Sequence, residues 1–287
     1  MSKNQEKAEK MRESYDKTAA VYDSRYSLIQ YIKYTILLEK IIQIKKRKDT
    51  IMLKLPSLLL DYGGGSLLFI DFLTAFNEFL LHSELIKEKD LALSECNNDQ
   101  MALFSYLISC LREDHLFNKR IDKINVEFVI PQTVIIDISY KMLKVGLEKI
   151  ENNQGKIYGC IACDGQHLPF RKKIFKSIVS FTAIQNLSDI KRGIREISRI
   201  ATKNPLVGLS ILKKKIDPSD FKEIFISEFQ NIEDLVIDDK YIFNLNNFIE
   251  SLNPEFKMIY NSRIRTLIEK NEDFFIWSIN KNINIYL

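Results

Sequence analysis

The chain has 287 residues, of which 46% are hydrophobic and 28% charged, and its formal net charge is +4. These proportions supply a sizeable core and exclude disordered and fibrous proteins. No uncharged stretch reaches the roughly 18 apolar residues of a membrane-spanning helix, and the charged N-terminus lacks the apolar core of a signal peptide. We therefore expect a cytoplasmic protein without a membrane span, whose four cysteines are reduced thiols.

Apolar and aromatic residues recur every three or four positions over residues 15–38, which predicts a helix. A polar linker is expected at residues 45–50. Residues 1–50 are therefore predicted to form an N-terminal helical lid. Residues 51–287 are predicted to form the main domain, with insertions at 84–130 and 214–254.

Glycine is scarce, at nine residues, yet three glycines are adjacent at positions 63–65. Because glycine loses the most entropy on folding, such a triplet is expected where the backbone needs a positive φ or where another group approaches closely. The apolar run 58–60 before it predicts a buried strand, and residues 67–81 after it predict a helix. A strand, a glycine turn and a helix form the first half of a nucleotide-binding βαβ unit.

The next strand is predicted late, at residues 133–136, because a polar insertion of helical character occupies residues 84–125. After it, strands alternate with helices, which predicts an α/β fold whose mostly parallel sheet is covered on both faces. The predicted strands are 156–162, 177–182 and 206–212, and the predicted helices are 142–150 and 190–200. Residues 217–249 are predicted as an interrupted helix, and 256–260 with 274–279 as a terminal antiparallel pair.

Acidic residues follow the first three strands of this predicted sheet, at Asp61, Asp137 and Asp164. Ligands of doubly wound sheets bind at the carboxyl ends of the strands. Asp137 is placed to accept hydrogen bonds from the ribose hydroxyls, and Asp164 from the exocyclic amine of a purine. A single Asp at a strand end is more often a turn or N-cap residue, but three beside a glycine turn favour an adenosine-bearing ligand.

Five segments carry a family resemblance, and they occur in family order over about residues 12–212: 15–23 (YDKTAAVYD), 60–65 (LDYGGG), 136–143 (IDISYKML), 164–170 (DGQHLPF) and 178–186 (IVSFTAIQN). Together they resemble the class I S-adenosylmethionine-dependent methyltransferases, in particular the type 11 group that includes quinone methyltransferases. The resemblance implies a Rossmann-like fold with a central seven-stranded sheet, and S-adenosyl-L-methionine as cofactor.

The resemblance also implies a set of cofactor-binding residues. Gly63 and Gly65 would let the backbone pass close to the methionine moiety, while Gly64 occupies a position where many residues are accepted. The other implied contacts are Asp61 at the glycine turn and the bound amino group, Asp137 at the ribose, Asp164 at the adenine amine, Ile138 and Gln166 beside the adenine ring, and Tyr15, Tyr22 and Arg25 in the helical lid.

Methyl transfer is an in-line displacement at a sulfonium carbon, so alignment can supply most of the catalysis and no nucleophilic side chain is needed. A neutral acceptor must lose a proton, which His167 or residues near Gln185 and Asn186 could assist. The alternative for His167 is a turn cap. Cys160 and Cys163 form a CxxC without a second pair, so core thiols are expected, and no metal site.

Departures from the family motifs leave a second hypothesis open. Leu67 stands where the family usually has a third glycine, and its branched side chain is expected to shrink the methionine end of the pocket. Residues 175–176 and 202–205 also differ from the usual motifs. The alternative is therefore a catalytically degenerate, methyltransferase-like module that holds a protein or RNA partner. A nicotinamide-dependent oxidoreductase is disfavoured, because the turn lacks the G-x-G-x-x-G spacing.

The acceptor is left open between RNA and a small molecule. Segments at 24–30, 168–171 and 183–185 have a patchy similarity to methyltransferases of guanine N7 in ribosomal RNA. Basic clusters at 45–48, 171–173, 192–199 and 213–215 could contact phosphates, although solvated helix ends and loops are the commoner explanation. Whether an activator subunit takes part is also left open.

Overall fold

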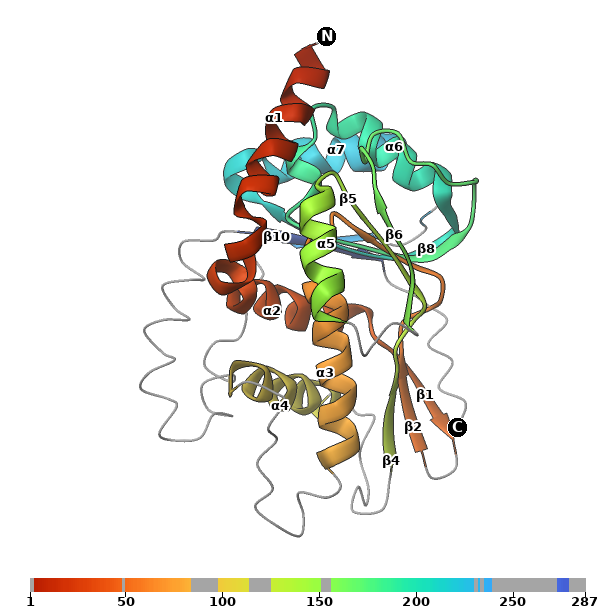
Figure 1. Ribbon diagram of the computed structural model, residues 1–287. Helices are drawn as coiled ribbons and strands as arrows, with labels where there is room; N and C mark the ends of the chain where they lie inside the picture. The colour runs from red at the N-terminus through yellow and green to blue at the C-terminus, as the bar shows by residue number, and fades with distance from the viewer. Residues whose placement is uncertain are drawn as a thin grey trace.

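The computed structural model describes residues 3–47, 50–83, 98–113, 125–150, 156–229, 232, 235–238 and 273–278. Its main sheet has seven strands in the order β6-β5-β3-β7-β8-β10-β9 (Figure 1). The strands are β3 (Leu59–Tyr62), β5 (Thr133–Asp137), β6 (Ile157–Ala162), β7 (Phe175–Phe181), β8 (Ala201–Leu212), β9 (Leu235–Asp238) and β10 (Asp273–Ser278). The pairs from β6 to β8 are parallel, and β10 is antiparallel to both β8 and β9. The predicted mostly parallel sheet is confirmed.

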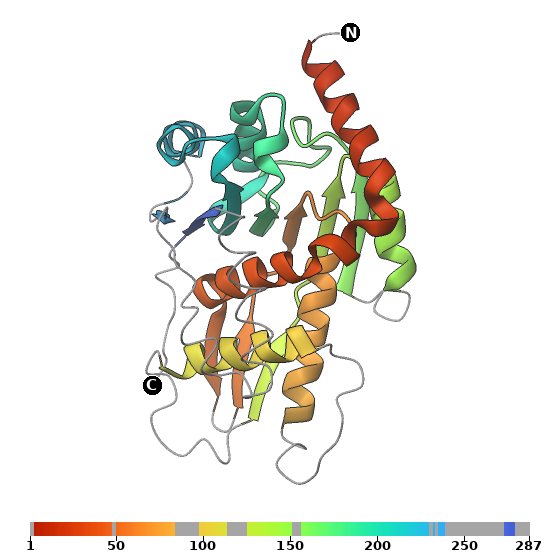
Figure 2. The ribbon, with the colours of Figure 1, turned by 90° about the vertical axis from the view of Figure 1, so that its left-hand side faces the viewer.

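Helices cover both faces of this sheet, as predicted (Figures 1 and 2). One face packs against α2 (Tyr22–Ile41), α3 (Leu68–Ser83) and α5 (Tyr140–Lys149), and the other against α6 (Ile190–Ile200) and α7 (Pro218–Glu228). All four residues of β3 are buried, because this strand lies in the middle of the sheet and has apolar neighbours on both sides. The carboxyl ends of the parallel strands therefore open at one edge, between the two helical layers.

The predicted helix 15–38 is divided in the structure. Helix α1 (Lys3–Thr18) has no buried residue, a 3₁₀ turn follows at Ala19–Val21, and α2 then runs into the core. Within α2, Lys33 forms a buried ion pair with Asp273 of β10, at 2.7 Å between Nζ and Oδ2. Helix α2 is thereby fixed to the sheet, whereas the N-terminal end of α1 extends beyond the body of the molecule (Figure 2). A lid role for the N-terminal helices stays a prediction.

A second, three-stranded sheet was not predicted. It consists of β1 (Gln43–Arg47), β2 (Thr50–Lys54) and β4 (Asn125–Val129), in the order β1-β2-β4. The polar linker predicted at 45–50 was wrong, because residues 45–47 belong to β1, which pairs with β2, and alternate residues of β2 are buried. The insertion is partly helical, as predicted, through α4 (Asn98–Glu113).

The C-terminal predictions were partly correct. Helix α7 occupies the start of the predicted stretch 217–249, but residues 235–238 form strand β9 instead of helix. The predicted strand 274–279 corresponds to β10 and is antiparallel, with β8 and β9 as partners. The predicted strand 256–260 lies outside the described residues. No helix in the described part of the chain is long and apolar enough to cross a membrane.

Leu67 does not narrow the pocket, contrary to the expectation from sequence. Its φ is +63°, so its backbone adopts the left-handed conformation that glycine favours. Its side chain is fully buried in the core and is not among the pocket-lining residues. A Cβ atom added to Gly146 of α5 would lie 2.5 Å from Leu67 Cδ1 and 2.6 Å from the Ser66 carbonyl carbon. Gly146 therefore makes the space in which Leu67 is accommodated.

Gly146→Ala is expected to destabilise the fold by about 1–3 kcal/mol, because the added methyl overpacks a fixed contact and outweighs the roughly 1 kcal/mol gained in helix propensity. Urea unfolding measures the difference. Gly159→Ala is the matched control, since a Cβ atom there meets nothing within 4 Å. An unchanged midpoint for Gly146→Ala would mean that Leu67 and Ser66 are not held against α5.

Candidate cofactor-binding site

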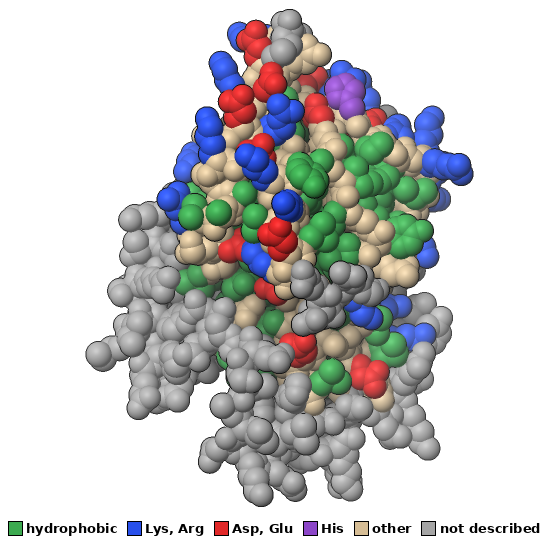
Figure 3. Space-filling model, viewed as in Figure 1, with side chains coloured by type: hydrophobic (Ala, Val, Ile, Leu, Met, Phe, Trp, Pro, Cys, Tyr) green, Lys and Arg blue, Asp and Glu red, His purple; other side chains and the backbone are tan. Residues whose placement is uncertain are grey.

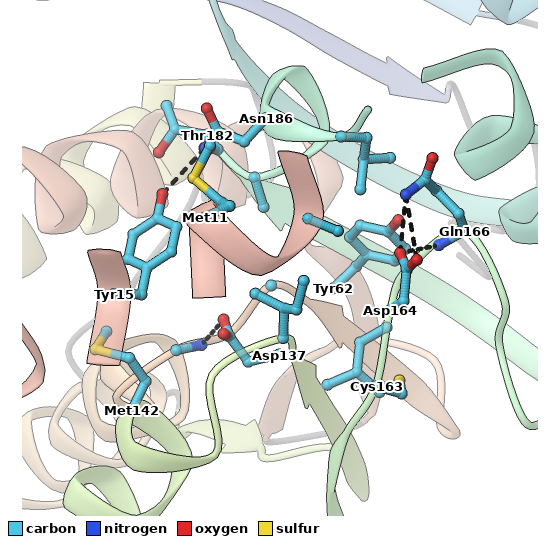
Figure 4. Close-up of a pocket in the computed structure, with 18 of the residues that line it drawn as sticks. Met11, Tyr15, Tyr62, Asp137, Met142, Cys163, Asp164, Gln166, Thr182 and Asn186 are labelled. Carbon is cyan, nitrogen blue, oxygen red and sulfur yellow. Dashed lines mark hydrogen bonds between the residues drawn. The ribbon is translucent and has the colours of Figure 1, made fainter. Parts of the chain in front are cut away.

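A pocket lies at the carboxyl ends of β3, β5, β6 and β7, with α1 across its mouth (Figure 4). Its wall is mostly apolar and aromatic, with two carboxylates, Asp137 and Asp164. The other lining residues include Ala8, Met11, Tyr15, Tyr22, Tyr62, Gly63, Gly65, Ile136, Ile138, Met142, Cys163, Gly165, Gln166, Phe181, Thr182, Ala183, Asn186, Leu187 and Ser188. This is the edge at which the sequence predicted a ligand.

The glycine turn forms one wall of the pocket. Gly63 and Gly65 have φ values of +76° and +51°, which side chains rarely adopt. The N–H groups of Gly63 and Gly64 donate to the carbonyl oxygen of Ile136, at 2.8 and 3.0 Å. Gly64 is also constrained, contrary to the expectation that its position accepts many residues, because an added Cβ would lie 2.5 Å from Asp61 Oδ2 and 2.6 Å from Ile135 Cγ2.

Asp137 connects the glycine turn to the next strand and helix. Its Oδ2 accepts from the Gly65 N–H at 3.0 Å (Figure 4), and its Oδ1 accepts from the Ser139 N–H at 2.8 Å. Burial raises the pKa of Asp137 to about 6, against the lowering effect of these hydrogen bonds. The carboxylate thus orders the turn while lining the pocket, where its remaining lone pairs can accept further hydrogen bonds.

Asp61 lies beneath the turn and is 1% exposed. Its Oδ2 is buried without a hydrogen-bond partner. Burial, and then the charge of Asp137, raise the pKa of Asp61 to about 7. A buried, unpartnered acceptor costs free energy unless a donor reaches it, so this oxygen is suited to a cationic group on a ligand.

Asp164 and Gln166 form the opposite wall. Asp164 Oδ1 accepts from the backbone N–H of Gln166 at 2.9 Å and from its Nε2 at 3.0 Å. Gln166 Oε1 in turn accepts from Ser188 Oγ and from the Asp189 N–H, at 2.9 and 2.8 Å. The loop after β6 is thereby joined to the segment before α6.

Helix α1 is held over the pocket by polar contacts. Asn186 Nδ2 donates to Tyr15 Oη at 3.0 Å (Figure 4), and Lys7 Nζ donates to the Leu187 carbonyl oxygen at 2.9 Å. Ser139 Oγ donates to Asp16 Oδ1 at 2.5 Å. Burial and the nearby charge of Asp137 raise the pKa of Tyr15 to about 12, so its hydroxyl is neutral.

Most of the predicted cofactor residues meet at this pocket. Asp137, Ile138, Asp164, Gln166, Gly63, Gly65, Tyr15 and Tyr22 all line it. Asp61 lines a smaller adjoining pocket with Gly63–Gly65. Arg25 is exposed and lies outside both pockets, so a role for it in the lid stays a prediction.

The three predicted catalytic residues are not brought together. Asn186 lines the pocket, but Gln185, its neighbour in the 3₁₀ turn Ile184–Asn186, points into the protein and donates through Nε2 to the Thr182 carbonyl oxygen at 2.6 Å. His167 is half-exposed and lies outside the pocket, 3.4 Å from Asp164 Oδ2. Catalytic roles for Gln185, Asn186 and His167 stay predictions.

Several lining residues were missed by sequence reasoning, among them Met11, Tyr62 and Thr182. Thr182 has φ +53°, an unusual conformation for a β-branched residue, and it directly follows β7 at the pocket. Strain of this kind cannot be read from a sequence.

Cys160 and Cys163 are free and half-buried, and burial raises both pKa values to about 11, so the thiols are neutral.

A family model described as a methyltransferase domain matches residues 123–207. No match was found among curated protein sequences. Solved structures with a similar fold include a chain from the complex between the Haloferax volcanii Trm112 methyltransferase activator and a methyltransferase, at 13% identity, with 92% of this chain and 96% of that chain covered and a TM-score of 0.47. A Thermotoga maritima S-adenosylmethionine-dependent methyltransferase is 10% identical, with 94% and 100% covered and a TM-score of 0.47.

The matched segment begins just before β4 and ends within β8, so it contains the strand ends that carry Asp137 and Asp164. The seven-stranded Rossmann-like sheet extends this segment on both sides, and the glycine turn lies next to it at the pocket. Residues 123–207 thus match a methyltransferase domain, and the described strands around them form the mostly parallel, Rossmann-like sheet that the sequence predicted.

Proposed function

We propose that the chain binds S-adenosyl-L-methionine in this pocket and transfers its methyl group to a small-molecule acceptor. The observation that carries the cofactor assignment is the unpartnered Asp61 Oδ2 beneath the glycine turn. An ammonium group, such as that of the methionine moiety, supplies the donors that this buried oxygen lacks. When bound, the cofactor supplies an electrophilic methyl group on its sulfonium.

The residues present fit the remaining parts of this cofactor. Asp137 and Asp164 offer carboxylate oxygens from neighbouring strand ends, suited to the ribose hydroxyls and the adenine amine. Ile138 provides an apolar surface between them. The glycine turn leaves room for close backbone approach, and α1 covers the mouth, which excludes water from the reacting atoms.

The acceptor side of the pocket favours a small molecule over RNA. Met11, Tyr15, Phe181 and Asn186 line it, and none of the described residues that line the pocket is Lys or Arg. RNA binding depends on cationic contacts to phosphates. The outer surface of α1 carries acidic and basic side chains intermixed, without a field of one sign (Figure 3).

Two basic residues counted as potential phosphate contacts already have carboxylate partners. Arg195 pairs with Glu228, at 2.8 Å between Nε and Oε2, and Arg199 pairs with Glu196, at 2.7 Å between Nε and Oε1.

Asn186 is the polar side chain best placed to contact an acceptor, because its amide lies at the pocket and is bonded to Tyr15. Breaking that bond would free the Tyr15 hydroxyl for an incoming acceptor, while Asn186 Nδ2 would keep its hydrogen bond to the Thr182 carbonyl oxygen at 3.1 Å.

Transfer of a labelled methyl group from the cofactor, with the chain alone, into fractionated RNA, protein and small-molecule pools tests the proposal. Label is expected in the small-molecule pool. Label in RNA alone would overturn the acceptor assignment. Because the chain is assayed alone, turnover would also show that no activator subunit is required. If S-adenosylhomocysteine fails to bind at millimolar concentration in a calorimetric titration, the binding-module alternative replaces the enzyme.

A further inference from the structure

Helix α2 buries three polar side chains in an otherwise apolar stretch, at Gln30, Lys33 and Thr35. Two of them find partners within the chain. Lys33 pairs with Asp273, and Thr35 Oγ1 donates to the Tyr31 carbonyl oxygen at 2.9 Å. Gln30 is different. The residue is only 5% exposed, and its Oε1 is buried without a hydrogen-bond partner.

The position of Gln30 is fixed by its amide nitrogen. Nε2 donates to Tyr22 Oη and to Thr182 Oγ1, each at 3.4 Å. Gln30 also lines a small buried pocket, called here the Asp61 pocket, with Tyr22, Tyr34, Asp61, Gly63, Gly64, Gly65, Ser66, Leu68 and Phe181. This pocket shares Tyr22, Phe181 and two glycines with the larger one, so the two pockets adjoin.

Two residues that line the Asp61 pocket, Asp61 and Gln30, therefore each have a buried oxygen without a donor, Oδ2 and Oε1, and they lie on elements far apart in the sequence. Leaving one such acceptor unsatisfied is costly, and two in one pocket indicate a ligand that carries several donors. An ammonium group has three N–H donors and no acceptor, which matches a site made of acceptors. A phosphate, which carries acceptors alone, would find no donor on Asp61 Oδ2 or Gln30 Oε1.

We infer that Gln30 is a cofactor-binding residue, whose Oε1 accepts a hydrogen bond from the ammonium group of the methionine moiety beside Asp61. This rests on the proposed function, and it adds a residue from α2 to the contacts expected from the strand ends and the glycine turn. It also gives Tyr22 and Thr182 a positioning role, because both hold the Gln30 amide in place.

The test compares two probes by calorimetric titration: S-adenosylhomocysteine, and the analogue in which hydrogen replaces its α-amino group. Gln30→Met keeps the side-chain length and removes the acceptor. We expect it to weaken binding of S-adenosylhomocysteine by about tenfold to one-hundredfold, the usual effect of losing a hydrogen bond to a charged group. Binding of the deaminated analogue should stay within about twofold of wild type.

Gln100→Met is the matched control, because Gln100 is a buried glutamine of α4 that lines neither pocket. It should leave both affinities unchanged. Equal losses for both probes in Gln30→Met, or no loss for either, would overturn the inference while leaving the proposed function intact. If the wild-type protein binds neither probe, the proposed function fails, and the inference fails with it.

Discussion

Asp61→Asn is expected to make the protein without cofactor more stable at pH 8 and at the same time to weaken cofactor binding. The Asp61 carboxylate is buried beside Asp137, and a pKa of about 7 in place of 3.8 corresponds to roughly 4 kcal/mol of destabilisation when the group is ionised. Asparagine has nearly the same shape and carries no charge. We expect it to recover a few kcal/mol of this free energy of unfolding.

The pH dependence follows from the direction of the shift. A carboxyl group whose pKa is raised by folding binds more protons in the native state, so stability falls as pH rises from about 4 to about 7 and is then constant. Asp137, with a pKa raised to about 6, adds to the same slope. Urea unfolding between pH 4 and pH 8 should show a shallower fall for Asp61→Asn, with the two proteins similar near pH 4.

Cofactor binding should respond in the opposite sense. Asp61 must be ionised to pair with an ammonium group, so the affinity of the wild-type protein is expected to fall as pH drops below about 7. Asp61→Asn should bind S-adenosylhomocysteine at least about tenfold more weakly at pH 8, and with little dependence on pH. A variant that is less stable and binds normally would mean that the carboxylate is satisfied within the protein.

Asp61 shows why the sheet and its strand-end acids could be predicted from sequence. The apolar run before it, the glycines after it and the regular alternation downstream are local patterns with a direct physical cause, so β3, β5, β6, β7 and β8 were all anticipated. Gln30 shows what could not be predicted from the sequence. Nothing local distinguishes it from Lys33 or Thr35 in the same helix, and only the packing of α2 against the glycine turn reveals which of the three lacks a partner.

The direction of individual side chains also could not be predicted from the sequence. Leu67 was placed in the pocket by its motif position, but its positive φ turns the side chain into the core, where Gly146 leaves room for it. Gln185 and Asn186 are adjacent in sequence, yet the 3₁₀ turn sends one into the protein and the other to the pocket. Motif position thus fixed the backbone path better than it fixed which atoms face a ligand.

Gly63→Ala is expected to have the largest effect of any single methyl group added to this chain's glycine turn. Its φ of +76° is unfavourable for alanine by about 1–2 kcal/mol. The new Cβ would also overlap the Cβ of Ala183, a short side chain at the end of β7 that has no rotamer through which to move. Either the turn or the segment Ala183–Asn186 must shift, and both line the pocket. We expect a destabilisation of about 3 kcal/mol or more and the loss of measurable cofactor binding.

Gly65→Ala separates the two causes of that loss. Its φ of +51° carries a similar backbone cost, but the new Cβ would lie 3.1 Å from Met142 Cε, the far end of a flexible side chain that can adjust. It should therefore lose only about 1–2 kcal/mol and keep weakened binding. Urea unfolding and calorimetry with S-adenosylhomocysteine measure both properties. Equal effects at the two glycines would assign the constraint to φ alone, whereas a much larger effect at Gly63 would show that the approach of β7 to the turn shapes the cofactor site.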